Sequence, residues 1–151
     1  MAAIHQKLYL GSNYDQINIS EFLADIMLII CNSDNRSQDL FEIMPIEESI
    51  HFEQAIPLGI IVHELATNTL KYAWKKKENR NKIHIKLAVH ERNFTLSYSD
   101  NGLGLPDNFQ IGDNSSFGIM LIDLLIHNQL NGEMDFFNKN GANFILKFKL
   151  L

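Results

Sequence analysis

The sequence predicts an α/β fold of the α+β type: a two-layer sandwich with helices on one face of a mixed, mostly antiparallel sheet. Two observations lead to this prediction. Four segments have apolar residues at helical spacing, and six segments with strand-like composition lie between and after them. Most of these strand candidates follow one another in hairpin-like pairs. Helices interleaved with such pairs are typical of a sheet that is covered on one face.

The bulk composition limits the class of protein. The chain of 151 residues can bury one core, and 46% hydrophobic with 21% charged residues is ordinary for a globular domain. A formal net charge of −5 argues against a nucleic-acid partner. The single cysteine, Cys31, excludes an internal disulfide, suits a reducing cytoplasm and lies in an apolar stretch, where buried packing is expected. Because no run approaches the roughly 18 apolar residues of a membrane span, we expect a cytoplasmic chain without membrane contact, although its parent protein can be membrane-associated.

The first part of the chain predicts two helices. Residues 2–10 have helical spacing but are too few to be stable alone, so they are expected to be the end of a longer element. A loop is expected at 11–15. Ser20 is then expected to cap a helix over 21–31. The apolar residues of this helix are Phe22, Leu23, Ile26, Met27 and Ile30.

Two further helices are predicted from the same periodicity. Pro57 occupies a plausible first helical position, where its missing N–H is not needed, and the longest helix is expected over 58–74. The other is expected over 118–130, ended by Asn131-Gly132. Its apolar residues, such as Leu121, Leu124, Leu125 and Ile126, are expected in the core. The strands, with the turns 91–93 and 138–141 between two pairs of them, are expected at 40–44, 49–52, 83–90, 94–99, 133–137 and 143–150.

The helix over 58–74 carries an acid, an amide and an ammonium group, Glu64, Asn68 and Lys71, along one stripe at the edge of its core face. This stripe can be a solvated face with a Glu-to-Lys pair at favourable spacing. An asparagine inside a helix is unfavourable, however, because its side chain competes for backbone hydrogen bonds. The pattern therefore indicates a use for Asn68 outside the helix. The core face itself is expected to consist of Ile61, Val62, Leu65 and Thr69.

A glycine-rich loop over 101–116 follows the strand at 94–99. Asp100 stands at the strand end and is followed by a Gly-x-Gly pattern, Gly102 and Gly104. Such a pattern can present a carboxylate to a pocket while the backbone approaches a ligand closely, although tight turns use the same residues. Gly118, at the start of the last helix, leaves backbone N–H groups free for an anion, which is a weak signal by itself.

Four motifs occur in a characteristic order. Residues 63–73 read His-Glu-Leu-Ala-Thr-Asn-Thr-Leu-Lys-Tyr-Ala, 100–104 read Asp-Asn-Gly-Leu-Gly, 117–121 read Phe-Gly-Ile-Met-Leu, and 141–144 read Gly-Ala-Asn-Phe. Together they resemble the N box, the two glycine boxes and the final motif of the ATPase module shared by gyrase, heat-shock chaperone, histidine kinase and mismatch-repair proteins. The resemblance implies the Bergerat ATP-binding fold of this GHKL group, with ATP and Mg²⁺ as cofactors.

Within this group the chain is most similar to sensor histidine kinases of two-component systems. The loop between the glycine boxes is short, and residues 100–106 read Asp-Asn-Gly-Leu-Gly-Leu-Pro. Residues 4–9, Ile-His-Gln-Lys-Leu-Tyr, resemble the end of the second dimerisation helix in an HWE-related branch, although the glycine box is not of the HWE type. The resemblance implies that residues 1–12 are the remnant of a dimerisation and phosphoacceptor domain and that residues 13–151 form the catalytic domain.

The resemblance also implies which residues form the site. Asp100 would accept a hydrogen bond from the adenine amino group, and Gly102 and Gly104 would let the backbone pass the base. The whole implied ATP site consists of Asn68, Lys71, Tyr72, Asp100, Gly102, Gly104, Ser116, Phe117, Gly118 and Ile119.

The phosphate end of the implied site uses the other motifs. Asn68 would bind Mg²⁺ through its side-chain oxygen, a hard ligand for a hard cation. Lys71 would meet phosphate oxygens, and the N–H groups around Gly118 would cradle the polyphosphate. Glu64 takes the catalytic position that orients or activates the attacking group in this family.

Two positions depart from the family pattern. The first position of the second glycine box, usually glycine, is Ser115 or Ser116. The usual Gly-Thr near the end is Gly141-Ala142, so a hydroxyl that supports the adenine-binding acid is missing at position 142. Either a water replaces that hydroxyl or the affinity for ATP is reduced.

The expected function is that of the ATP-holding half of a histidine kinase, with a response regulator as the downstream partner. The candidate phosphoacceptor histidines all lack the expected context: His5, His51, His84, His90 and His127. The acceptor is therefore expected on an upstream helix, and the fragment is expected to bind ATP without phosphorylating itself. Two alternatives stay open: a nucleotide-binding regulatory module without transfer activity, and a serine kinase of the anti-sigma-factor type.

Overall fold

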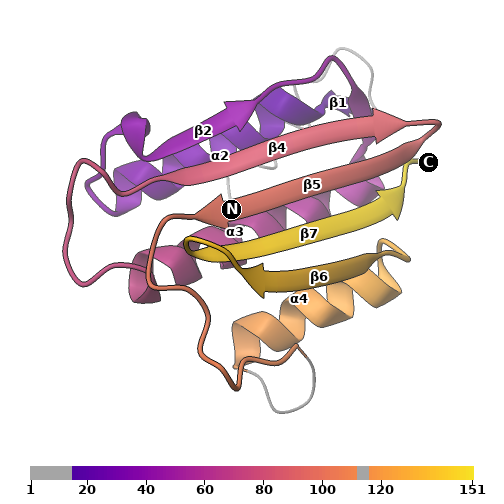
Figure 1. Cartoon of the computed structure of the whole chain (residues 1–151). Coiled ribbons are helices and arrows are strands. Elements are labelled where there is room, and N and C mark those ends of the chain that lie inside the picture. Colours follow the sequence, from indigo (N-terminus) through magenta and orange to yellow (C-terminus); the bar gives the residue numbers. More distant parts are fainter. Residues whose placement is uncertain (1–14, 112–115) are drawn as a thin grey trace.

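The computed structural model describes residues 15–111 and 116–151, and it has two layers (Figure 1). A five-stranded sheet forms one layer, and three helices pack behind it. The predicted helical piece at 2–10 and most of the predicted loop at 11–15 lie outside the described residues. The elements are β1 (Gln16–Asn18), α2 (Ile19–Ser33), the 3₁₀ turn η1 (Gln38–Leu40), β2 (Phe41–Met44), β3 (Ser49–His51), α3 (Phe52–Tyr72), β4 (Ile83–His90), β5 (Asn93–Asp100), α4 (Phe117–Asn128), β6 (Glu133–Asn138) and β7 (Ala142–Lys149).

The sheet has the strand order β2-β4-β5-β7-β6. β2 runs parallel to β4 and the other neighbours are antiparallel, so the predicted mixed, mostly antiparallel sheet is confirmed. Residues alternate between a buried and an open face, as they must when one face of a sheet packs on a core. Leu87, Leu96 and Leu146 stand side by side on the buried face of three adjacent strands. His84 and His90 lie on the opposite face and are exposed, as the alternation predicts.

The core fills the space between this sheet and the helices. The predicted core face of α3 is confirmed, because Ile61, Val62, Leu65 and Thr69 are all buried. Gly59 lets α2 and α3 approach closely: a Cβ there would lie 2.9 Å from Ile26 and 3.0 Å from Phe22. Cys31 is also buried, and burial raises the pKa of its thiol, which fits the predicted packing role.

The start of α2 differs from the prediction. Its N-cap is Asn18, whose side chain accepts a hydrogen bond of 3.0 Å from the Glu21 N–H, and not Ser20. Ser20 is the second residue of the helix, and its hydroxyl donates to the Ile46 carbonyl and accepts from the Ile46 N–H. The cap lies two residues earlier than predicted because Asn18 ends β1, a short strand that pairs with β3 and was not predicted.

The start of α3 also differs. The helix begins at Phe52 with His51 as its N-cap, so Pro57 lies inside the helix rather than at its first position. The predicted strand at 49–52 ends one residue earlier for the same reason. Gln54, buried in the first turns, donates to the Lys149 carbonyl at 2.8 Å and accepts from the Leu151 N–H at 3.1 Å. These contacts hold the start of α3 to the end of β7 and offset the backbone bond that Pro57 cannot make.

Two smaller predictions were wrong. The turn between β4 and β5 contains only Glu91 and Arg92, both with positive φ, while Asn93 already pairs with His90. On α4, Ile122 and Ile126 are buried but Leu124 is 53% exposed. α4 lies at the edge of the layer, beside β6, so only a narrow stripe of it can face the core (Figure 1). No helix in residues 15–111 or 116–151 is both long and apolar enough to cross a membrane.

We predict that Asn18→Ala lowers the free energy of unfolding by about 1 kcal/mol, because it removes the N-cap of α2. Urea denaturation followed by circular dichroism measures this loss. Asn18→Asp should retain most of the stability, since a carboxylate accepts the same bond. Equal stability of the Ala variant and the unmodified chain would contradict the assignment of the cap.

Candidate functional site

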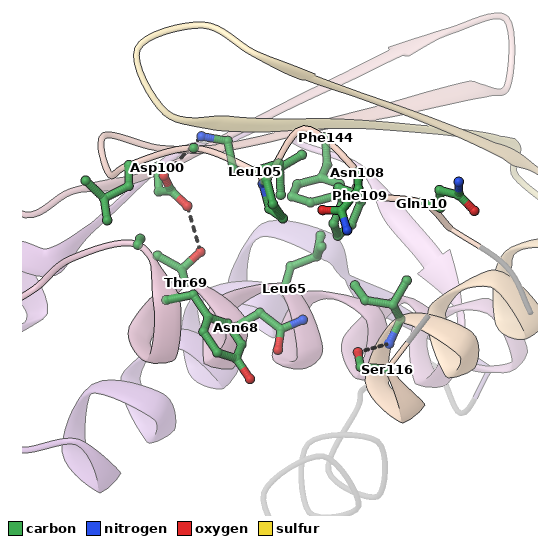
Figure 2. A pocket seen from close by; sticks show the side chains of 17 residues that line it. Leu65, Asn68, Thr69, Asp100, Leu105, Asn108, Phe109, Gln110, Ser116 and Phe144 are labelled. Carbon is green, nitrogen blue, oxygen red and sulfur yellow. Dashed lines mark hydrogen bonds between the residues drawn. The ribbon is translucent and has the colours of Figure 1, made fainter. Parts of the chain in front are cut away.

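A cavity of about 800 Å³ opens between α3, the loop after β5, the start of α4 and the beginning of β7 (Figure 2). Each side contributes a different chemistry. The helix side provides amide and hydroxyl groups and the end of β5 a carboxylate, while the loop adds the amides of Asn108 and Gln110 to apolar side chains that it shares with β7. The residues that line it are Leu65, Asn68, Thr69, Tyr72, Ala73, Asp100, Leu103, Gly104, Leu105, Pro106, Asn108, Phe109, Gln110, Ser116, Ile119, Ala142 and Phe144.

Asp100 is the only ionisable carboxylate among these lining residues, and it is only 6% exposed. Its Oδ1 accepts hydrogen bonds from the Gly102 N–H at 3.0 Å and the Ala142 N–H at 3.2 Å. Its Oδ2 accepts one from the Thr69 hydroxyl at 3.0 Å. A carboxylate has about four acceptor positions, so these three donors leave Oδ2 able to accept one more.

Tyr98 stands behind Thr69. Their oxygens are 2.7 Å apart, and the tyrosine side chain is buried beneath the cavity wall, with its ring edge against Phe144. Burial raises the pKa of Tyr98 well above its usual range, so the phenol keeps its proton. Sequence reasoning missed both hydroxyls as site residues. The signal for Thr69 was there: a polar side chain on the core face of the helix that carries the other site residues.

The loop after β5 is held from the β6 side by Asn138. Its side chain accepts from the Leu105 N–H at 2.7 Å and donates to the Leu105 carbonyl at 2.9 Å. Gly104 has φ +88°, and a Cβ there would lie 2.8 Å from the Asn138 amide oxygen. Glycine is required at this position by both conformation and space.

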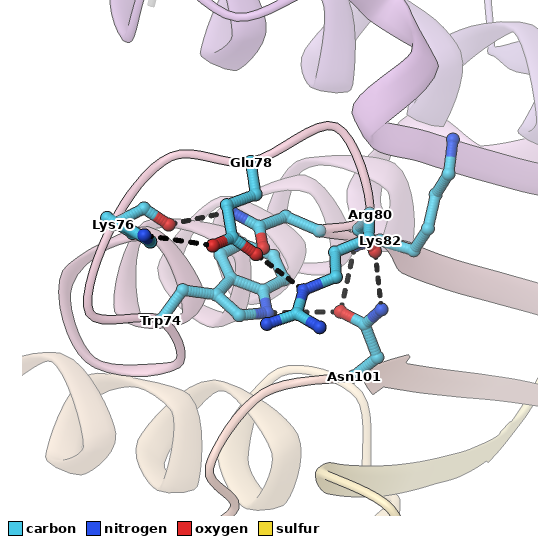
Figure 3. Close-up of polar contacts among 7 residues, drawn as sticks. Trp74, Lys76, Glu78, Arg80, Lys82 and Asn101 are labelled. Atoms are coloured by element: carbon cyan, nitrogen blue, oxygen red, sulfur yellow. Dashed lines mark hydrogen bonds and ion pairs between the residues drawn. The ribbon is translucent and has the colours of Figure 1, made fainter.

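The loop is held from the other side by Asn101 (Figure 3). Its amide oxygen accepts from the Trp74 indole at 3.0 Å and from the Lys82 N–H at 2.9 Å, and its amide nitrogen donates to the Arg80 carbonyl at 2.6 Å. The Leu103 N–H donates to the Ala73 carbonyl at 2.8 Å. The segment between α3 and β4 and the loop after β5 are therefore locked together at the root of the cavity.

The apolar wall has aromatic rings at its base. Phe109 meets Phe144 edge-on, with ring centroids 6.1 Å apart, and meets Phe136 at 4.9 Å. Leu65 faces these rings from α3 (Figure 2), and Ile119 of α4 also lines the cavity. A slot that sets one carboxylate beside this group of apolar side chains suits a flat ring that carries a hydrogen-bond donor at its edge.

The structure brings some of the predicted site residues into this cavity: Asn68, Tyr72, Asp100, Gly104, Ser116 and Ile119. Lys71 is exposed and Gly102 packs on Ala73, where a Cβ would lie 2.5 Å from the Ala73 carbonyl oxygen. Glu64 reaches the start of α4, since a Cβ on Gly118 would lie 2.6 Å from its Oε2. Phe117 is 80% exposed. Lys71, Gly102, Glu64, Phe117 and Gly118 thus lie near the cavity without lining it.

The start of α4 is capped by Ser116, whose hydroxyl lies 3.5 Å from the Ile119 N–H. The first N–H groups of a helix have no partner within the helix, so this end can receive a negative charge. Over residues 15–111 and 116–151, no group of three or more His, Cys, Asp or Glu side chains is placed to hold a metal ion.

A family and several individual proteins are similar to this chain. The family described as histidine kinase-, DNA gyrase B- and HSP90-like ATPase matches residues 53–151. The sensor histidine kinase PdtaS of Mycobacterium tuberculosis is 23% identical over 141 residues, which are 89% of this chain and 27% of that protein. The chain therefore spans about a quarter of the length of this curated relative.

Solved structures share the fold. The blue-light activated histidine kinase of Erythrobacter litoralis EL346 superposes with a TM-score of 0.83 at 18% identity, over 99% of this chain and 51% of that one. The ATP binding domain of PrrB from Mycobacterium tuberculosis superposes with a TM-score of 0.70 at 16% identity, over 91% of this chain and 97% of that one. The predicted two-layer fold is confirmed by these likenesses.

We predict that Asn138→Ala speeds hydrogen exchange at the Leu105 amide about 3- to 10-fold, because this N–H loses its partner. Amide exchange followed by NMR measures the change. Lys139→Ala, in the adjacent turn, serves as the control and should leave the Leu105 amide unchanged. Equal exchange in both variants would show that Asn138 does not hold the loop.

Proposed function

This chain belongs to the family of histidine kinase-, DNA gyrase B- and HSP90-like ATPases, and from this premise we propose that its cavity binds ATP with Mg²⁺. The observation that carries the proposal is the Asp100 carboxylate, which is buried beside the apolar side chains of the slot and keeps one acceptor position. A purine with an exocyclic amino group matches both features.

The adenine ring would lie in the slot between the helix side and the aromatic wall. Its amino group would donate to Asp100 Oδ2, beside the bond from Thr69. Leu65, Ile119 and Phe144 would cover the ring faces and remove apolar area from water. A base with a carbonyl at the same position would set two oxygens against each other, so this arrangement favours adenine over guanine or hypoxanthine.

The phosphates would extend from the slot toward Asn68 and the start of α4. Asn68 lines the cavity from α3 and offers an amide oxygen, a hard ligand that fits Mg²⁺. Mg²⁺ commonly takes only one or two protein ligands and completes its octahedron with phosphate oxygens and water. A single protein ligand, the Asn68 amide oxygen, would therefore be enough here. Backbone N–H groups at Ser116 to Gly118 would neutralise phosphate charge, and Lys71, one turn beyond Asn68, would add a cation.

We further propose that the reaction at this site is transfer of the γ-phosphoryl group to a histidine, as the names of the similar kinases suggest. Phosphoryl transfer needs positioning and charge neutralisation more than covalent chemistry by the enzyme. Glu64, beside Gly118, would orient the attacking imidazole. The acceptor histidine would lie on an upstream dimerisation domain of the same protein, to which residues 1–12 would belong, with a response regulator receiving the phosphate in the cytoplasm.

We predict that the chain binds ATP in isothermal titration calorimetry, more tightly with Mg²⁺ than with EDTA, and that Asp100→Asn weakens binding at least about 10-fold. The amide would set its NH2 group at the Oδ2 position, where it would face the adenine amino group donor to donor, at a cost of about 1.5–3 kcal/mol. Asp135→Asn, on exposed β6, is the matched control and should bind as the unmodified chain does. No binding under either condition would refute the proposal.

A second prediction concerns the reaction in a longer form of the protein that includes the upstream helices. Incubation with radiolabelled ATP should give a phosphate that is lost in acid and stable in base, as expected for phosphohistidine. Glu64→Gln should slow labelling about 10- to 100-fold while ATP affinity stays within about 3-fold. The reason is that the Glu64 carboxylate would orient the attacking imidazole and would not contact the adenine ring. Acid-stable labelling would favour the serine kinase, and ATP binding without labelling would favour the regulatory module.

A further inference from the structure

We propose that Thr69 and Tyr98 are positioning residues for Asp100: two buried hydroxyls in series that orient the carboxylate toward the adenine amino group. This inference rests on the proposed ATP function. It also accounts for the family departure at Ala142, since a hydroxyl reaches the carboxylate from α3 rather than from β7.

The contacts form a single line from the core to the cavity. The Tyr98 hydroxyl lies 2.7 Å from the Thr69 hydroxyl, which lies 3.0 Å from Asp100 Oδ2. Thr69 is 5% exposed and Tyr98 is 1% exposed, so neither hydroxyl is freely hydrated. Both Thr69 and Asp100 line the cavity (Figure 2), whereas Tyr98 is not among the lining residues and reaches the site only through Thr69.

The direction of these hydrogen bonds follows from the number of protons. Thr69 has one hydroxyl hydrogen. If Thr69 gave it to Tyr98, the Thr69 oxygen and Asp100 Oδ2 would face each other at 3.0 Å with no proton between them. The stable arrangement has Tyr98 donating to Thr69 and Thr69 donating to Asp100. Tyr98 cannot easily lose its proton when buried, so the direction is maintained.

This direction has a consequence for base selectivity. Oδ1 is held by the two backbone donors of Gly102 and Ala142, and Oδ2 is held by Thr69 on one side only. The carboxylate is therefore fixed in rotation, and its remaining acceptor position points in one direction. Without the Thr69 donor, the carboxylate would be less firmly oriented and Oδ2 could bind water instead. The hydrogen bond from the adenine amino group to Oδ2 would then weaken.

The decisive variant is the double substitution Thr69→Val with Tyr98→Phe. It replaces two hydroxyls that face each other by apolar groups of nearly the same shape, so no buried polar atom of the pair is left unpaired and the fold should be retained. Calorimetric affinities for ATP and for inosine triphosphate, which lacks the amino group, are compared with those of the unmodified chain. The ratio of ATP to inosine triphosphate affinity should fall about 10-fold, with little change in affinity for inosine triphosphate.

Two further variants separate positioning from a general structural effect. Thr69→Ser keeps the hydroxyl and should keep the ratio within about 2-fold of the unmodified chain. Thr67→Val removes a hydroxyl from the same helix, one that donates to the Glu64 carbonyl at 3.2 Å, and should leave the ratio unchanged. Thermal melting of each variant verifies that it is folded.

The outcomes are distinct. ATP binding with an unchanged ratio in the folded double variant would overturn the positioning role and leave the proposed function standing. An equal fall of the ratio in Thr67→Val would also overturn it. Absence of ATP binding by the unmodified chain would overturn the proposed function, and the positioning role with it.

Discussion

The interaction on which this structure depends is the set of three hydrogen bonds received by the Asp100 carboxylate. The donors come from α3, from the loop after β5 and from the start of β7, so one side chain joins three parts of the chain. Hydrogen bonds to a charged group contribute about 1.5–3 kcal/mol each, and a buried carboxylate without them would cost several kcal/mol. These bonds therefore couple the fold to the site, because the donors that stabilise the buried carboxylate also fix its position at the cavity.

Close backbone approach is the second constraint on the site. Gly141 has φ +133°, and a Cβ there would lie 1.9 Å from the Asp100 carbonyl oxygen. Gly102 similarly packs against the end of α3. Hydrogen bonds of Asn101 and Asn138 then hold the first part of the loop after β5, at Asn101 itself and at Leu105. The cavity is thus anchored at its base, while its outer edge includes exposed residues such as Leu103.

The sequence predicted the layers of the fold well, because apolar periodicity and turn residues record which face of each element is buried. The prediction failed where contacts with an element far away in the sequence determine the start of a helix or the partner of a polar side chain. Asn18 rather than Ser20 caps α2 because β1 pairs with β3, and Gln54 stabilises a helix start five residues before Pro57. The same reason explains Thr69, which has the periodicity of a core residue but bonds to Asp100 across 31 positions of sequence.

The most direct test of the central claim is a crystal structure of this chain with Mg²⁺ and a non-hydrolysable ATP analogue. We expect the adenine amino nitrogen to lie within hydrogen-bonding distance of Asp100 Oδ2, about 2.7–3.2 Å. The ring should pack against Phe144, and the Asn68 amide oxygen should coordinate the Mg²⁺. A nucleotide bound elsewhere, or an adenine whose amino group does not face Asp100, would contradict the central claim.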